Sequence, residues 1–234
     1  MFIESNNFNK CSGCYACVLV CPKKCIQMKK NEEGFWFPKI EKNECIGCRM
    51  CEKVCPAVTE ERNSEVLNSY AAVNPDQICR RSSSSGGVFP ALAEYVLGQR
   101  GIVYGAALAE DCRSVFHIEV TSMDELYKLK GSKYVQSNVD HLFVKIKVQL
   151  ENKMLVLFSG TPCQVAGLKK YLSKEYENLI AVDLICHGVA SPLLLEKYLK
   201  YYEEKNNQKI RSEDFRFIFA RIFPCEMVWR YQRE

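Results

Sequence analysis

The sequence predicts a small α+β domain over residues 1–58, followed by a larger α/β domain over residues 70–234. Three observations support this division. A cysteine-rich segment is repeated at an interval of 34 residues, residues 59–69 are polar and aperiodic like a linker, and strand and helix patterns alternate after residue 70. A chain of 234 residues is long enough to bury a core in each part.

The composition excludes several classes of protein. The net charge is only +4, and Lys and Arg alternate with Asp and Glu, so we expect no nucleic-acid binding. No apolar run reaches the ~18 residues of a membrane span, and the N-terminus lacks the basic and apolar regions of an export signal. We therefore expect a cytoplasmic protein, in which 14 cysteines indicate metal binding rather than disulfides.

Eight of these cysteines form two copies of the pattern C-x2-C-x2-C-x3-C-P. This is the pattern of bacterial two-cluster ferredoxins, in which the fourth cysteine of each copy ligates the other cluster. We therefore predict two 4Fe–4S clusters in a ferredoxin-like domain. Zinc is the alternative, although zinc sites usually pair two C-x2-C knuckles instead. The predicted ligands are Cys11, Cys14, Cys17 and Cys55 for one cluster, and Cys45, Cys48, Cys51 and Cys21 for the other.

The segment between the two cysteine runs predicts a β-hairpin that turns at residues 31–34. Residues 35–37, Phe-Trp-Phe, are expected to form a hydrophobic lid over a cluster. Cys25 is a ninth cysteine, which we expect to pack as a small apolar residue.

The second domain is predicted to contain a partly parallel sheet covered by helices. A loop is expected at residues 78–85. The expected strands are 70–73, 102–109, 115–121, 154–158 and 179–186, and the expected helices are 87–98, 123–130, 139–150, 164–172 and 192–204.

Two glycine-containing loops of this domain are candidate anion sites. The first opens a helix, where unpaired amides and the helix dipole favour a phosphate or a flavin pyrophosphate. The alternative is a serine-rich capping loop without a ligand. In the second loop, Lys133 either meets a phosphate or the charge of a reduced flavin, or is an exposed lysine. The candidate residues are Ser83, Ser84, Ser85, Gly86 and Gly87 in the first loop, and Gly131, Ser132, Lys133 and Tyr134 in the second.

Two further loops follow predicted strands, where open α/β sheets bind ligands. Thr161 is expected to cap a helix that begins at Pro162, which places Cys163 and Gln164 in its first turn. Cys163 is a cluster ligand, a redox-active thiol or a packed small residue. Cys186 and His187 end the next strand, and His187 is either a proton donor or structural.

Four segments in this order resemble the coenzyme F420 hydrogenase/dehydrogenase beta-subunit family: residues 82–89, 131–137, 158–164 and 186–188. The resemblance covers about residues 70–215 and implies a flavin-type domain with FAD. It implies that the Ser83–Gly87 and Gly131–Tyr134 loops contact FAD. It also implies that Thr161, Cys163 and Gln164 lie close to the redox centre, with Cys163, His187 and Lys133 as candidate catalytic residues.

The expected function is that of an oxidoreductase that passes electrons between the two clusters, FAD and a small substrate of hydride type. The alternative is a non-catalytic relay subunit for a partner oxidoreductase. A ferredoxin or an oxidoreductase subunit is the expected redox partner in either case. The sequence departs from the family after residue 217, so we expect the C-terminal part of the flavin domain to be missing.

Overall fold

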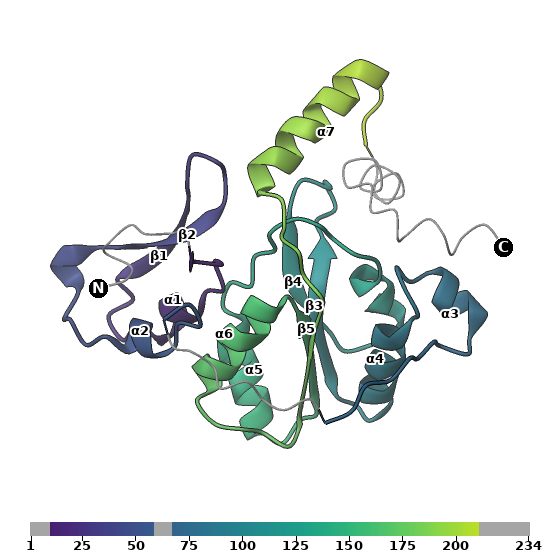
Figure 1. The fold of residues 1–234 in the computed structure, drawn as a ribbon, viewed down its shortest axis with the longest axis horizontal. Helices are drawn as coiled ribbons and strands as arrows, with labels where there is room; N and C mark the ends of the chain where they lie inside the picture. Colours follow the sequence, from purple (N-terminus) through teal and green to yellow (C-terminus); the bar gives the residue numbers. More distant parts are fainter. Residues whose placement is uncertain (1–9, 59–66, 211–234) are drawn as a thin grey trace.

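The computed structural model describes residues 10–58 and 67–210 (Figure 1). The predicted linker at 59–69 lies mostly outside these ranges, as does the segment after residue 217. Within the described ranges the protein is a mixed α/β structure with one sheet in each part of the chain.

The N-terminal part consists of a β-hairpin and short helices that follow the cysteine loops. Its elements are α1 (Ala16–Val20), β1 (Ile26–Lys30), β2 (Trp36–Ile40), η2 (Lys42–Glu44) and α2 (Met50–Lys53). The predicted hairpin is confirmed, since β1 and β2 pair in antiparallel fashion with Met28 opposite Pro38. The side chain of Asn31 closes the turn by accepting a 2.8 Å hydrogen bond from the Phe35 amide.

The second part is built on a four-stranded sheet in the order β4-β3-β5-β6. β3 (Ile102–Leu108) pairs antiparallel with β4 (Val115–Val120) and parallel with β5 (Val156–Gly160), which pairs parallel with β6 (Leu179–Asp183). Every residue of β5 is buried because both faces of the sheet are covered. The predicted partly parallel sheet is therefore confirmed.

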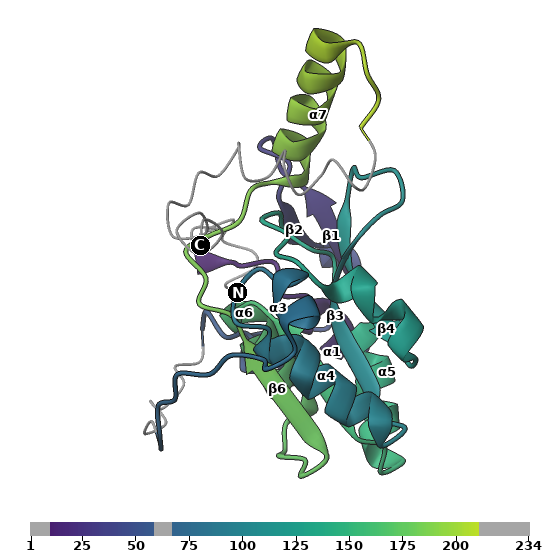
Figure 2. The ribbon, with the colours of Figure 1, turned by 90° about the vertical axis from the view of Figure 1, so that its right-hand side faces the viewer.

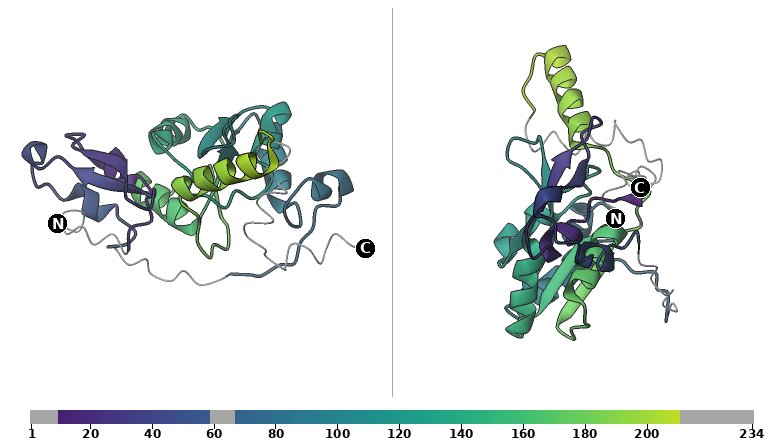
Figure 3. Two further views of the ribbon diagram at one scale, coloured as in Figure 1. Left: turned by 90° about the horizontal axis from the view of Figure 1, so that it is seen from above. Right: turned by 90° about the vertical axis from the view of Figure 1, so that its left-hand side faces the viewer.

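Helices cover the two faces of this sheet (Figures 1 and 2). α5 (Leu142–Glu151) and α6 (Pro162–Leu172) pack on the face toward the N-terminal part, while α4 (Val88–Gly98) and η3 (Met123–Leu129) cover the other face. α7 (Pro192–Asn206) projects away from the sheet, as the right-hand view in Figure 3 also shows. Leu195 and Leu199 attach α7 to Cys112 and Val115 beside the β3–β4 turn.

The first cysteine loop packs directly on α6. Cys14, Tyr15 and Ala16 belong to the same buried cluster as the inner residues of α5 and α6. Gly167 of α6 permits this approach, because a Cβ added there would lie 3.0 Å from the Cys14 Sγ. The N-terminal part is therefore joined to the α/β sheet through one of its predicted cluster-binding loops.

Three expectations about secondary structure are wrong. Residues 70–73 form no strand; Tyr70 and Val73 are exposed and pair with no described strand. The expected loop at 78–85 begins inside a helix, α3 (Gln77–Arg81), which Asp76 caps by accepting from the Ile78 amide at 2.8 Å. Residues 184–186 lie beyond the end of β6. The remaining strands and helices are confirmed to within three residues, with residues 123–129 as a 3-10 helix.

Candidate functional site: two thiol cavities beside a large cavity

Four predicted ligands surround one small cavity, which we call the first thiol cavity. Cys11, Cys14, Cys17 and Cys55 line it together with apolar groups such as Met28, and no charged side chain lines it. Burial raises the pKa of the Cys14 thiol to about 12, and the neighbouring thiols of Cys55 and Cys11 add to the rise. A cationic iron–sulfur group offsets this cost when it binds the thiolates.

The other four predicted ligands surround the second thiol cavity, which is lined by Cys21, Cys45, Cys48 and Cys51. Cys25 lies on the same wall, with its Sγ 3.5 Å from the Sγ of Cys21. Cys25 is buried among apolar neighbours, as expected for a packed residue.

Each thiol cavity groups the cysteines as the spacing predicts for two cubanes. Each combines three cysteines of one repeat with the fourth cysteine of the other. The identity of the ligands stays a prediction.

Phe35, Trp36 and Phe37 do not line either thiol cavity, so the expected cluster lid is wrong. Successive side chains at the start of β2 point to opposite faces of the hairpin. Phe35 and Phe37 therefore line the large cavity described next, whereas Trp36 lines a separate outer cavity. Pro38 and Met28 take the place beside the first thiol cavity instead.

A large cavity of about 830 Å³ lies at the carboxyl ends of β5 and β6, between the sheet and the N-terminal hairpin. It gathers nearly all of the predicted cofactor-binding residues, from three loops that are far apart in the sequence. Those that line it are Ser83, Ser84, Ser85, Gly86, Gly87, Gly131, Ser132, Lys133, Thr161, Cys163 and Gln164.

Two predicted site residues do not line the large cavity. Tyr134 packs with the α7 side of the molecule instead. His187 is exposed, although its neighbours Cys186 and Gly188 do line the cavity.

Asn74, which the sequence analysis missed, holds the first glycine loop in place. Its amide donates to the Gly86 carbonyl at 2.6 Å, and its side-chain Nδ2 donates to the Gly87 carbonyl at 3.3 Å. Gly87 needs its left-handed backbone, with φ of 76°, to start α4 at this point. The Ser132 amide donates to the Ser84 Oγ at 2.7 Å, which joins the two candidate anion loops into one wall.

Lys133 supplies a positive charge to this wall. Its Nζ donates to the carbonyls of Lys128 and Lys130 at 3.0 Å each, and it forms no ion pair with any described residue. Burial lowers the pKa of Lys133 to about 8, because the surroundings disfavour the ammonium without a compensating carboxylate. An anion bound beside Lys133 would stabilise the ammonium form and so raise its pKa again.

Cys163 lies at the start of α6, which begins as the sequence predicts. Thr161 is the N-cap, Pro162 occupies the first turn, and the Gln164 Oε1 accepts from the Thr161 amide at 3.0 Å. The Sγ of Cys163 lies 3.0 Å from the Thr161 Oγ1. The Thr161 hydroxyl also donates to the Gln164 Oε1 at 3.1 Å, so Thr161 accepts from the Cys163 thiol.

Gln164 continues this hydrogen-bond chain to a buried histidine. Its Nε2 donates to the Ser137 Oγ at 2.8 Å, and Ser137 lies 3.1 Å from the Nδ1 of His117. The Nε2 of His117 lies 3.1 Å from the Ser159 carbonyl, which only accepts. His117 is therefore protonated on Nε2, and its Nδ1 accepts from Ser137.

The position of His117 in the sequence carries one signal that predicts its burial. His117 lies two residues after Val115 on β4, so both side chains are on the inward face of the strand. A polar ring therefore occupies an otherwise apolar face. In the structure the ring stacks on Phe158, with centroids 5.3 Å apart.

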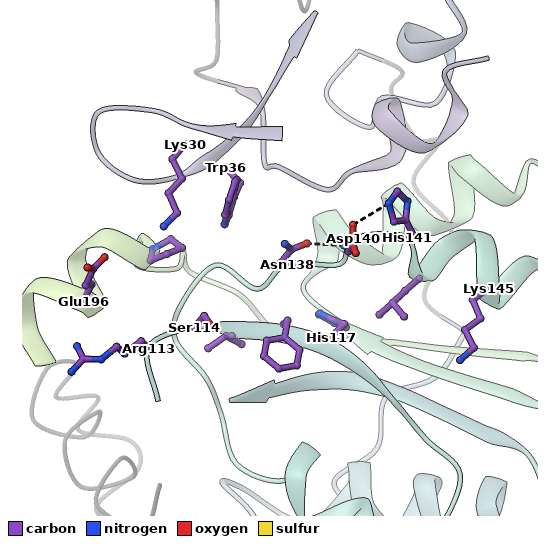
Figure 4. A pocket seen from close by; sticks show the side chains of 14 residues that line it. Lys30, Trp36, Arg113, Ser114, His117, Asn138, Asp140, His141, Lys145 and Glu196 are labelled. Atoms are coloured by element: carbon purple, nitrogen blue, oxygen red, sulfur yellow. Dashed lines mark hydrogen bonds and ion pairs between the residues drawn. The ribbon is translucent and has the colours of Figure 1, made fainter. Parts of the chain in front are cut away.

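His117 also contributes to an outer cavity of about 580 Å³ on the other side of β4 (Figure 4). Trp36 and Lys30 of the hairpin face Arg113 and Lys145 across this space. Both cations form ion pairs. The Nη2 of Arg113 lies 2.8 Å from the Oε2 of Glu203, and the Nζ of Lys145 lies 3.0 Å from the Oε2 of Glu119.

The first thiol cavity and the large cavity share a wall. Cys11, Ser12 and Gly13 line both. An iron–sulfur group held by Cys11 would therefore border the space at the sheet edge.

Comparison with protein families gives two matches. The family model for the C terminus of the beta subunit of coenzyme F420 hydrogenase/dehydrogenase matches residues 153–233, which include the N-terminus of α6 and extend beyond the described residues. A 4Fe-4S dicluster domain matches residues 10–58, which contain both cysteine loops. The chain is therefore similar to the beta subunit of coenzyme F420 hydrogenase/dehydrogenase over residues 153–233, and to 4Fe-4S dicluster domains over residues 10–58.

Together the two matches support an iron–sulfur electron-transfer subunit of oxidoreductase type. No match was found among curated proteins. No helix in residues 10–58 and 67–210 is both long and apolar enough to cross a membrane.

Proposed function

We propose that the chain is an iron–sulfur flavoprotein oxidoreductase, which passes electrons between two 4Fe–4S clusters, FAD and a small acceptor or donor of hydride type. One observation carries the proposal: the large cavity at the strand ends shares the wall of Cys11–Gly13 with the first thiol cavity. A redox group in the large cavity would thus lie next to one held by the thiols.

The thiol cavities supply the predicted cluster ligands. Cys11, Cys14, Cys17 and Cys55 would hold the inner cluster, which borders the large cavity. The outer cluster would be held by Cys21, Cys45, Cys48 and Cys51.

The large cavity has the size and chemistry that FAD requires. Its volume of about 830 Å³ falls in the range of ligand sites, which are about 300–1,000 Å³. The Ser83–Gly87 loop offers hydroxyls and amides at the start of α4, and Lys133 offers a cation without an acidic partner, so both suit the pyrophosphate. FAD, when bound, supplies the conversion between single electrons and hydride.

The chain's own groups would orient the reactants and exclude water. Phe35 and Phe37 close the side of the cavity that faces the hairpin. Cys163, whose thiol donates to Thr161, would place its Sγ at the strand-end wall beside a bound substrate. His117 is neutral and accepts only from Ser137, so it fixes this chain and is not itself a proton donor to the cavity.

The decisive experiment measures iron, sulfide and FAD in one anaerobically purified sample. We expect about eight irons per chain and bound FAD. The Lys133→Met substitution should weaken FAD binding by about tenfold or more, because it removes a charged donor worth about 1.5–3 kcal/mol. Lys128→Met is the matched control, since Lys128 pairs with Glu125 on the surface at 2.6 Å.

Equal FAD affinity in both variants would contradict the assigned site. Iron and sulfide without any flavin would instead favour the relay subunit, which transfers electrons to a partner that carries the active site.

A further inference from the structure

The two thiol cavities differ in their surroundings. The first is lined by uncharged groups, packs on α6 through Cys14 and Gly167, and borders the large cavity. No residue that lines the second also lines the large cavity. Electrons that reach the large cavity from another molecule would therefore enter at the second thiol cavity and pass through the first.

The rim of the second thiol cavity combines exposed apolar and cationic side chains. Ile46 and Met50 are 61% and 40% exposed, and the predicted ligand Cys48 is exposed between them in the sequence. Lys23 and Arg49 complete the rim.

The charge of this rim is positive. No carboxylate lines the cavity, and neither Lys23 nor Arg49 forms an ion pair with another described residue. Lys24, which follows Lys23, and Lys53, four residues after Arg49, are also exposed. The nearby carboxylates in the chain, Glu41, Glu44 and Glu52, do not line the cavity.

We propose that this rim, formed by Lys23, Ile46, Cys48, Arg49 and Met50, is the docking surface for an acidic protein that carries single electrons. The apolar pair excludes water at the centre of the contact, and the cations attract and orient a partner of opposite charge. Each encounter transfers one electron between the carrier and the outer cluster, so one is oxidised as the other is reduced and no proton or bond moves. The inference rests on the iron–sulfur part of the proposed function.

The test compares two variants with the same change of charge. Lys23→Glu/Arg49→Glu reverses the rim, whereas Lys153→Glu/Lys174→Glu reverses two exposed lysines of the second domain. The probe is an acidic plant-type [2Fe–2S] ferredoxin. Its dissociation constant from the cluster-loaded chain is measured in the oxidised state by calorimetry, at low and high salt.

We expect the rim variant to raise the dissociation constant by about tenfold or more at low salt, and the control variant to leave it within about twofold. Wild-type binding should weaken as salt rises, because exposed charges are screened. The rate of cluster bleaching by the reduced ferredoxin should fall in parallel, whereas the rate with the methyl viologen radical cation should not fall.

Equal binding by both variants, or binding insensitive to salt, would overturn the docking surface. Absence of iron and sulfide from the purified chain would contradict the proposed function. Equal dissociation constants of the two variants in samples with full iron would contradict the docking surface alone.

Discussion

Individual buried polar residues hold the strand-end wall of the large cavity in one arrangement. His117, Ser137, Gln164 and Thr161 form a chain in which every hydrogen bond points away from the Cys163 thiol toward the Ser159 carbonyl. Buried groups of this kind are costly when one partner is lost, so the chain fixes the rotamers of all its members. The orientation of Cys163, at the start of α6, thus depends on a histidine in β4.

The buried state of His117 makes stability depend on pH. Burial, with a smaller contribution from the nearby positive charge of Lys133, lowers the pKa of His117 from 6.5 to about 4. Between these pH values the unfolded chain binds a proton that the folded chain does not, so stability falls as pH falls through this window. From pH 7 to pH 5 the loss is on the order of 2 kcal/mol.

Urea unfolding of wild type and His117→Asn at both pH values checks this expectation. The variant is less stable at pH 7 but lacks the titrating group, so its loss between pH 7 and pH 5 should be smaller by about the same 2 kcal/mol. Acid also destabilises the clusters, but it does so equally in both proteins. This effect therefore cancels when the free energies of unfolding of wild type and variant are subtracted. Identical pH dependence would mean that His117 is protonated in the folded state.

At the scale of elements, a feature could be predicted from the sequence when the residues that form it lie close together along the chain. The cysteine loops, the hairpin and the Thr161 cap depend on spacings of a few residues, so the sequence analysis located them. Asn74 contacts Gly87 13 residues away, and Gln136 contacts Trp36 100 residues away, so neither role is visible locally. Residues 70–73 have strand-like composition but no partner strand, which composition does not reveal.

The assignment of the cysteine ligands is itself testable. Cys14→Ser removes a thiol from the first thiol cavity and should reduce iron from about eight to about four per chain. Cys25→Ser is the control, because Cys25 is buried on the wall of the second cavity but outside both four-cysteine sets. It should leave the iron content unchanged. Full iron in Cys14→Ser, or loss of iron in Cys25→Ser, would require a different set of ligands.

At the scale of the whole molecule, the two parts of the chain form one electron path only if the hairpin stays on the sheet domain. Gln136 secures this contact. Its Oε1 accepts from the Trp36 amide at 2.8 Å, and its Nε2 lies 3.4 Å from the Trp36 carbonyl. Gly13 of the first cysteine loop leaves room for it, since a Cβ there would lie 2.5 Å from the Gln136 Nε2.

Replacing Gln136 with leucine should therefore loosen the junction between the parts. The Trp36 amide would lose its side-chain acceptor at a partly buried position, which costs about 1–3 kcal/mol. Hydrogen exchange at the Trp36 amide should become faster, and the free energy of unfolding should fall by that amount. Gln27→Leu on the exposed side of β1 should change neither quantity. Unchanged protection of Trp36 in Gln136→Leu would show that apolar packing of the first cysteine loop on α6, through residues such as Cys14 and Ala16, is enough to hold the hairpin.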